Sequence, residues 1–183
     1  MKAYRIMAFA AAAMLFAACG KDEATDSAVT PKPHTDYLIC DGVAHPFVKE
    51  TALGENGFYQ VYLSPATPGD DFRVELLMKQ EDVGKNFDLT TDHAGDYSID
   101  VRLDEATTFS FEAYEGVVYS VYGDSIYEDV SALSEGRFFT QLTDVDFSTE
   151  VDVLLANGHR IRIGTVTPVD SIRYLPYCGS NVD

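Results

Sequence analysis

Apolar side chains recur at every second position along most of the chain from Tyr37 onward. The longest such run extends from Asp144 to Leu155. One parity holds Val145, Phe147, Thr149, Val151, Val153 and Leu155, and the other holds Asp144, Asp146, Ser148, Glu150 and Asp152. A period of two indicates a β-strand, and this clean alternation is typical of an antiparallel sheet with one buried and one solvated face. We therefore expect the parity of Val145 to face the core.

Shorter segments repeat the pattern between turn signals rich in Gly, Pro and Asp. They lie around residues 37–40, 58–63, 72–79, 97–103, 109–114, 117–121 and 138–142. The segments predict an all-β fold, namely an antiparallel β-sandwich or a closed barrel of roughly nine to eleven strands. A lipocalin-like up-and-down barrel is the alternative. We expect residues 36–183 to form one domain, a usual domain size.

The turn at Ala156-Asn157-Gly158 allows a test of strand register. A two-residue Asn-Gly loop would place Val153 opposite Arg162, which sets an apolar face against arginines. A three-residue loop places Val153 opposite Ile161 and Asp152 opposite Arg162, so both faces match. Because a slip of one residue would flip every side chain, we predict the three-residue loop, with Gly158 in the left-handed conformation.

The first eighteen residues have the pattern of an export signal. A charged start with Lys2 and Arg5 precedes an apolar run from Ile6 to Ala18, which is shorter than the ~20 residues of a membrane-spanning helix. The following Ala17-Ala18-Cys19-Gly20 resembles the bacterial lipobox. That resemblance implies cleavage before Cys19 and acylation of Cys19, with the lipid as the membrane attachment.

Residues 19–35 read as a lipidated flexible tether, because they contain Pro31 and Pro33 and have no apolar periodicity. Lys21-Asp22-Glu23 resembles the surface-export signal of Bacteroidota lipoproteins. With the lipobox, it implies a small Bacteroidota-type surface lipoprotein in the outer membrane, facing the cell surface. An anchor that faces the periplasm is the alternative. The family of the β-domain is not assigned by these motifs.

If Cys19 carries lipid, Cys40 and Cys178 remain as a pair near the two ends of the folded region. An exported protein lies outside the reach of cytosolic reductants, so we predict a disulfide between them, with two free thiols as the alternative. The loop between them exceeds 130 residues, for which the chain-entropy account gives about 4–5 kcal/mol of stabilisation.

The chain of 183 residues has a net charge of −17, and removal of residues 1–18 would leave 11 basic and 30 acidic residues, a net charge of −19. This acidity argues against nucleic acid as a partner, since phosphates require clusters of Lys and Arg. It is compatible with a cationic partner. Asp144 and Asp146 are weak candidates for a calcium site, because Ca²⁺ prefers carboxylate oxygens. We expect no cofactor.

No catalytic motif is visible, and the four His residues have no metal-binding spacing. We therefore expect no enzymatic activity. Phe58, Tyr62, Tyr114 and Tyr122 fall on the parity opposite to the expected core, where an exposed ring stacks on a sugar or lines a protein interface. The sequence thus predicts a lipid-anchored, non-enzymatic binding or adhesion module for a glycan or protein. A lipocalin-like carrier of a small apolar ligand is the alternative, and the oligomeric state stays open.

Overall fold

The computed structural model describes residues 35–91, 95–105, 107–114, 117–122, 125–127 and 133–176, with the backbone alone for 117–122 and 125–127. These residues form fourteen β-strands and two short 3-10 turns, and none of them lies in an α-helix. The strands are β1 (Tyr37–Cys40), β2 (Val43–Ala44), β3 (Phe47–Gly54), β4 (Phe58–Pro65), β5 (Arg73–Lys79), β6 (Asn86–Asp88), β7 (Tyr97–Arg102), β8 (Phe109–Tyr114), β9 (Val117–Tyr122), β10 (Ser125–Tyr127), β11 (Leu133–Leu142), β12 (Asp146–Leu155), β13 (Arg160–Pro168) and β14 (Arg173–Leu175). The turns are η1 (Gln80–Asp82) and η2 (Val169–Ser171). The described residues contain no helix with the length and apolar character that a membrane crossing requires.

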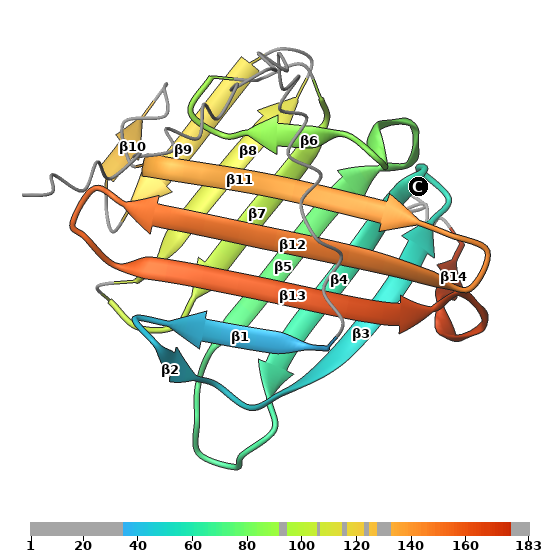
Figure 1. The fold of residues 1–183 in the computed structure, drawn as a ribbon, viewed down its shortest axis with the longest axis horizontal. Coiled ribbons are helices and arrows are strands. Elements are labelled where there is room, and N and C mark those ends of the chain that lie inside the picture. Colours follow the sequence, from blue (N-terminus) through green and yellow to red (C-terminus); the bar gives the residue numbers. More distant parts are fainter. Residues whose placement is uncertain are drawn as a thin grey trace, which may run out of the picture.

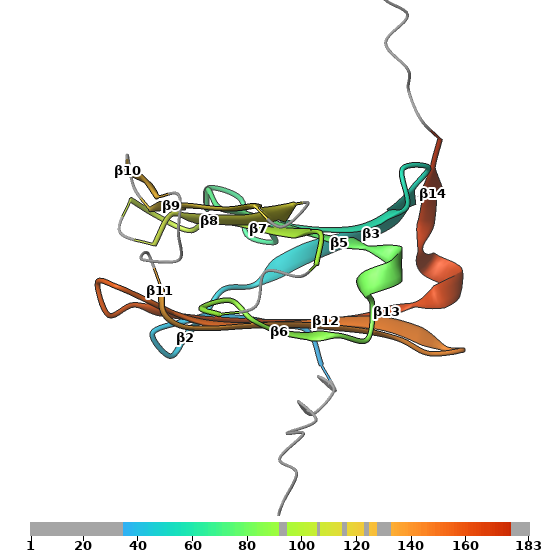
Figure 2. The ribbon, with the colours of Figure 1, turned by 90° about the horizontal axis from the view of Figure 1, so that it is seen from above.

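The strands form two sheets that lie face to face as two layers (Figures 1 and 2). The six-stranded sheet has the order β2-β1-β13-β12-β11-β6, and the eight-stranded sheet has the order β10-β9-β8-β7-β5-β4-β3-β14. Each sheet has two outermost strands that pair on one side only. The predicted β-sandwich is therefore confirmed, in place of the closed barrel or the lipocalin-like barrel.

The structure has more strands than the sequence pattern predicts. Five of them have no counterpart among the predicted segments, namely the outermost strands β2, β6, β10 and β14, each only two or three residues long, and the eight-residue strand β3. The four outermost strands are too short to show a readable alternation. Strand β14 also pairs parallel with β3, whereas every other recorded strand pair is antiparallel. Short outermost strands leave little open backbone for another chain to pair with.

Aromatic side chains fill much of the space between the two sheets. Tyr59 of β4 stacks on Phe147 of β12, with ring centroids 4.4 Å apart. Tyr97 of β7 contacts Phe87 of β6 at 4.6 Å and Phe138 of β11 at 5.6 Å. These rings are at most 5% exposed, so they join the layers through a packed core.

The hairpin between β12 and β13 has the predicted register. Val153 lies opposite Ile161 and Asp152 lies opposite Arg162, which confirms the three-residue loop. Gly158 has a φ of +94°, a conformation that glycine adopts without steric cost. The side chain of Asp152, however, reaches diagonally to Arg160, whose Nε and Nη2 donate to its two oxygens at 2.9 and 3.0 Å.

The start of the longest alternation is the exception to its pattern. Val145, expected to face the core, is 70% exposed, because β12 begins only at Asp146. Thr143, Asp144 and Val145 form the turn after β11, in which the Thr143 amide donates to the Asp146 carbonyl at 2.8 Å. The prediction for Val145 is therefore wrong, since turn geometry overrides the period of two at that end.

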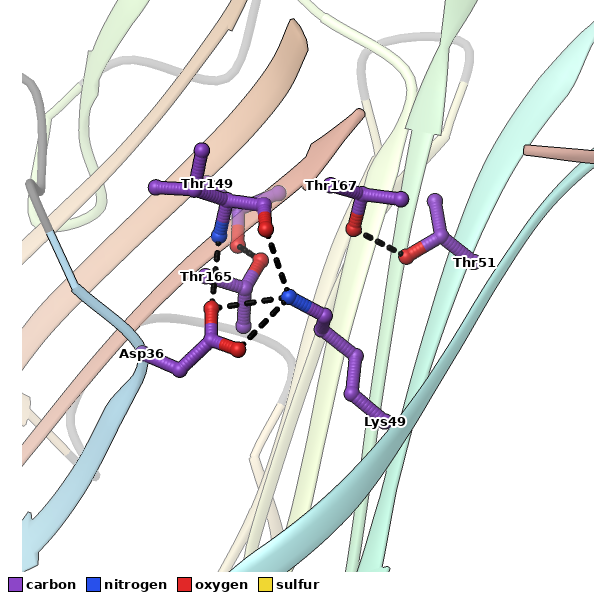
Figure 3. A network of polar contacts seen from close by, with 7 residues as sticks. Asp36, Lys49, Thr51, Thr149, Thr165 and Thr167 are labelled. Atoms are coloured by element: carbon purple, nitrogen blue, oxygen red, sulfur yellow. Dashed lines mark hydrogen bonds and ion pairs between the residues drawn. The ribbon is translucent and has the colours of Figure 1, made fainter. Parts of the chain in front are cut away.

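A polar layer crosses the buried face of the six-stranded sheet (Figure 3). Thr149 and Thr165 share a hydrogen bond at 2.7 Å, and Thr167 joins Thr51 of the opposite sheet at 2.7 Å. Beside them, the Lys49 ammonium of β3 donates to both Asp36 oxygens at 2.8 Å and to the carbonyl of Val166 at 2.7 Å. The amide of Val166 donates in turn to Asp36 at 2.8 Å. The cluster of Asp36, Lys49 and Val166 therefore connects the residue before β1 to β3 in one sheet and to β13 in the other.

Candidate functional site

Three of the four aromatic candidates lie on the outward face of the eight-stranded sheet. Phe58 and Tyr62 belong to β4 and Tyr114 belongs to β8, on the parity opposite to the buried positions. Tyr122, in β9, pairs in register with the buried Phe109, so the backbone does not align it with the other three. The side chain of Tyr122 lies outside the described part of the chain.

Phe58 and Tyr114 flank an open cleft of about 200 Å³ on this face. They belong to strands separated by β5 and β7, as Figure 1 shows, so the cleft crosses four neighbouring strands. At the usual inter-strand distance, the span between the axes of β4 and β8 is roughly 14 Å. Tyr114 is 50% exposed and Phe58 is half-buried. The cleft therefore offers two ring faces to a ligand of extended shape.

The floor of the cleft combines apolar and polar groups. Leu77 and Ala113 supply apolar surface, while Asn56, Gln60, Ser98 and Glu112 supply hydrogen-bonding groups. The register places Gln60, Leu77, Ser98 and Glu112 in one row across the four strands. Ligand sites typically combine apolar walls with a few fixed polar groups of this kind.

Two amides at the β4 end of the cleft are oriented by local contacts. The side-chain oxygen of Asn56 accepts from the Phe58 amide at 3.3 Å, within the turn that joins β3 to β4. The oxygen of Gln60 accepts from the Tyr62 hydroxyl at 3.1 Å. Their amide nitrogens remain as donors, since no partner for either is recorded among the described residues.

The neighbouring row on the same face holds Tyr62, Glu75 and Asp100, and its two carboxylates pair with arginines of the row beyond it. Arg73 forms an ion pair with Glu75, and Arg102 forms one with Asp100 at 3.2 Å. Tyr62 stands in this row rather than in the cleft lining, and burial, followed by the negative charge of Glu75, raises its pKa. Tyr62 is thus near the cleft without forming part of its wall.

The weak calcium candidates are used in turn formation. Asp144 is exposed in the loop, and the Oδ1 of Asp146 accepts from the Thr143 hydroxyl at 2.9 Å. Within the described residues, no group of three or more His, Cys, Asp or Glu side chains is arranged to hold a metal ion. The structure therefore brings no further ligand to these two carboxylates in the described part of the chain.

Cys40 is buried in β1 on the core side of the six-stranded sheet. Desolvation by burial, followed by the charges of Asp41 and Asp104, raises the pKa of its thiol to about 11. Cys178 and Cys19 lie outside the described residues. The disulfide and the lipid attachment therefore stay predictions.

A second hollow, of about 490 Å³, lies on the outward side of the six-stranded sheet next to β6. Its lining includes Asp88, Glu135, Arg137, Asp152 and Arg160 and contains no aromatic residue. Arg160 joins Asp152 and, at 3.2 Å, Glu135. This hollow is larger than the cleft, but Arg160, Asp152 and Glu135 in its lining already form ion pairs with one another.

Sequence reasoning found the two aromatic walls of the cleft but not its polar floor. The signal was present, because Gln60 follows Phe58 by two positions and Glu112 precedes Tyr114 by two. In a strand such residues share a face. What the pattern lacks is the pairing of β4, β5, β7 and β8 that brings them together. No family model, curated protein or solved structure matches the chain.

Proposed function

We propose that the protein is a non-enzymatic carbohydrate-binding module, held at the outer surface of the cell envelope by a lipid on Cys19. The observation that carries the binding part is the cleft between Phe58 and Tyr114. The location rests on the lipobox-like Ala17-Ala18-Cys19 and on Lys21-Asp22-Glu23.

The chemistry of the cleft fits a saccharide in two respects. An aromatic ring face packs against the apolar C–H face of a sugar ring, and Tyr114 and Phe58 offer such faces. Amides, a hydroxyl and a carboxylate on the floor match the many donors and acceptors of sugar hydroxyl groups. The span of roughly 14 Å fits an oligosaccharide better than a single ring.

The binding test uses the Cys19→Ala protein, which is expected to be soluble, on an array of glycans. We expect binding to at least one oligosaccharide, and Tyr114→Ala should weaken it about tenfold, equal to about 1.4 kcal/mol. Tyr174→Ala is the matched control, because Tyr174 is also exposed but lies outside the cleft. Equal affinities of the Tyr114→Ala and Tyr174→Ala proteins would refute the assignment of the cleft.

The anchoring test separates membrane and soluble fractions of cells that express the protein. Wild type should sediment with membranes, and Cys19→Ala should appear in the soluble fraction, because the acyl chains supply the membrane affinity. Protease added to intact cells should degrade a surface-facing protein and spare one that faces the periplasm. Unchanged fractionation of Cys19→Ala would rule out the lipid anchor.

A protein ligand is the second candidate, favoured by apolar side chains at one end of the sandwich. Tyr174, which is 64% exposed, lines a hollow there with Leu142 and Val169. Val145, 70% exposed, adjoins this hollow, because its carbonyl accepts from the Val169 amide at 3.0 Å. Adhesion of expressing cells to protein-coated surfaces should then fail with Val145→Glu and survive Tyr114→Ala. If adhesion to glycan-coated surfaces instead fails with Tyr114→Ala and survives Val145→Glu, the result supports the carbohydrate module.

A further inference from the structure

We propose that the cleft selects saccharides that carry a free amino group, with the carboxylate of Glu112 pairing with the ammonium. This inference rests on the proposed carbohydrate binding and specifies its ligand class. It follows from which charged side chains lie at the cleft and from whether each of them is already paired within the protein.

Among the residues that the structure describes, Glu112 is the one charged residue in the cleft lining. It lies on the outward face of β8, in the row with Ser98, and its side chain is exposed. Among the described residues, no hydrogen bond or ion pair engages its carboxylate. Tyr114, two positions along the same strand, places a ring on the same face.

The cations around the cleft are already engaged with carboxylates. Arg73 and Arg102 pair with Glu75 and Asp100 in the neighbouring row. Lys79, opposite Phe58 in register, contacts Asp96 and Glu81 at 2.8 Å each. No Lys or Arg of the described part of the chain lines the cleft. The one charge offered to a ligand is therefore negative.

This arrangement distinguishes three classes of saccharide. A uronate or sulfated sugar would meet Glu112 with no compensating cation, so repulsion opposes its binding. A neutral sugar gains ring stacking and hydrogen bonds alone. An amino sugar adds an ion pair with Glu112, and its ammonium is also attracted by the faces of Phe58 and Tyr114. The net charge of −17 further favours a cationic ligand over an anionic one.

The test compares two oligosaccharides of equal length, one of glucosamine and one of N-acetylglucosamine, by calorimetric titration of the Cys19→Ala protein at pH 6. We expect the glucosamine oligomer to bind about tenfold more tightly, since one exposed ion pair and one cation–π contact together give an effect of this order. Glu112→Gln should abolish the preference, so that the two oligomers bind this variant with equal affinity. Glu135→Gln, an exposed carboxylate on the other sheet, is the matched control and should retain the preference.

Three outcomes decide the inference. Equal binding of both oligomers by wild type, with affinities lowered by Tyr114→Ala, would overturn the amino-sugar selectivity and leave the carbohydrate module standing. A preference that persists in Glu112→Gln would also overturn it. Displacement of the glucosamine oligomer by ethanolamine at equal concentration would show that charge alone is recognised, which contradicts a saccharide site. Absence of binding to any saccharide on the array would instead refute the proposed function.

Discussion

On the outward face of the six-stranded sheet, opposite charges meet across neighbouring strands, whereas the cleft on the eight-stranded sheet is lined by two aromatic rings and an exposed carboxylate. The register sets Asp88, Arg137, Asp152 and Arg162 in one row across β6, β11, β12 and β13. One row further along, the ring of Tyr37 covers Gly164. The corresponding row of the eight-stranded sheet holds Gln60, Leu77, Ser98 and Glu112.

The difference teaches that the pairing of charges, and not their number, marks a binding face. The charges in the row of the six-stranded sheet alternate in sign, so each of them lies opposite a charge of the other sign. The polar side-chain atoms of this sheet without a recorded partner among the described residues, Thr140 Oγ1, Ser148 Oγ and Glu150 Oε2, are buried and so are not presented to a ligand. On the eight-stranded sheet, the Glu112 carboxylate and the amide nitrogens of Asn56 and Gln60 have no recorded partner among the described residues, so they can still bind a ligand.

The largest expected effect comes from filling the space above Gly164. A Cβ there would lie 2.3 Å from the ring of Tyr37, so Gly164→Val must displace that ring. We expect a loss of about 1–3 kcal/mol in the free energy of unfolding, measured by urea denaturation. With Tyr37→Ala already present, adding Gly164→Val should cost much less. An equal cost in both backgrounds would contradict the packing of Tyr37 on Gly164.

Breaking the charge pairing of the six-stranded sheet should have a smaller effect. Asp152→Asn removes the carboxylate that binds Arg160 in two hydrogen bonds, but both side chains are partly exposed. We expect a loss of about 0.5–1 kcal/mol in urea denaturation, which declines in 1 M salt. Glu112→Gln on the other sheet should leave the stability nearly unchanged. A larger loss for Glu112→Gln would mean that Glu112 has a structural partner.

The half-buried Glu150 gives a stability effect that depends on pH. Burial raises the pKa of its carboxyl above 4.5, with the positive charge of Arg137 acting in the opposite direction. A raised pKa means that ionisation of Glu150 opposes folding, so its contribution is fully present below pH 4.5 and is lost as pH rises through the folded-state pKa. Glu150→Gln stays neutral and should be more stable than wild type at pH 7. This advantage should shrink below pH 4.5, and an advantage independent of pH would argue against ionisation as its cause.

The smallest expected effect separates the cleft from the row beside it. Tyr62→Phe removes the hydroxyl that donates to Gln60 but keeps the ring. Since Tyr62 does not line the cleft, we expect saccharide affinity to change by less than about twofold, equal to about 0.4 kcal/mol. A loss as large as that of Tyr114→Ala would extend the binding site into the charged row.

Alternation along single strands made the sandwich and the register of the β12–β13 hairpin predictable, because both follow from which face is buried. Val153 and Asp152 needed no knowledge of distant strands. The cleft needed such knowledge, since Gln60 and Glu112 meet only through two intervening strands. The hydrogen bond between Thr149 and Thr165 was also not predictable from the alternation. A threonine at an inward position fits the apolar pattern, and its hydrogen-bond partner is known only from the structure.

We expect the cluster of Asp36, Lys49 and Val166 to bear a mechanical load applied at the start of the described chain. A pull on the chain that precedes Asp36 acts first on contacts to β13 in one sheet and to β3 in the other. The load is therefore divided between both layers before it reaches the hydrogen bonds of β1. Lys49→Ala would remove one of these two supports, so β1 should detach at lower force in single-molecule pulling. The cleft lies on the far side of the eight-stranded sheet, away from this loaded strand, so drag on a bound ligand and tension applied at Asp36 act at separate places.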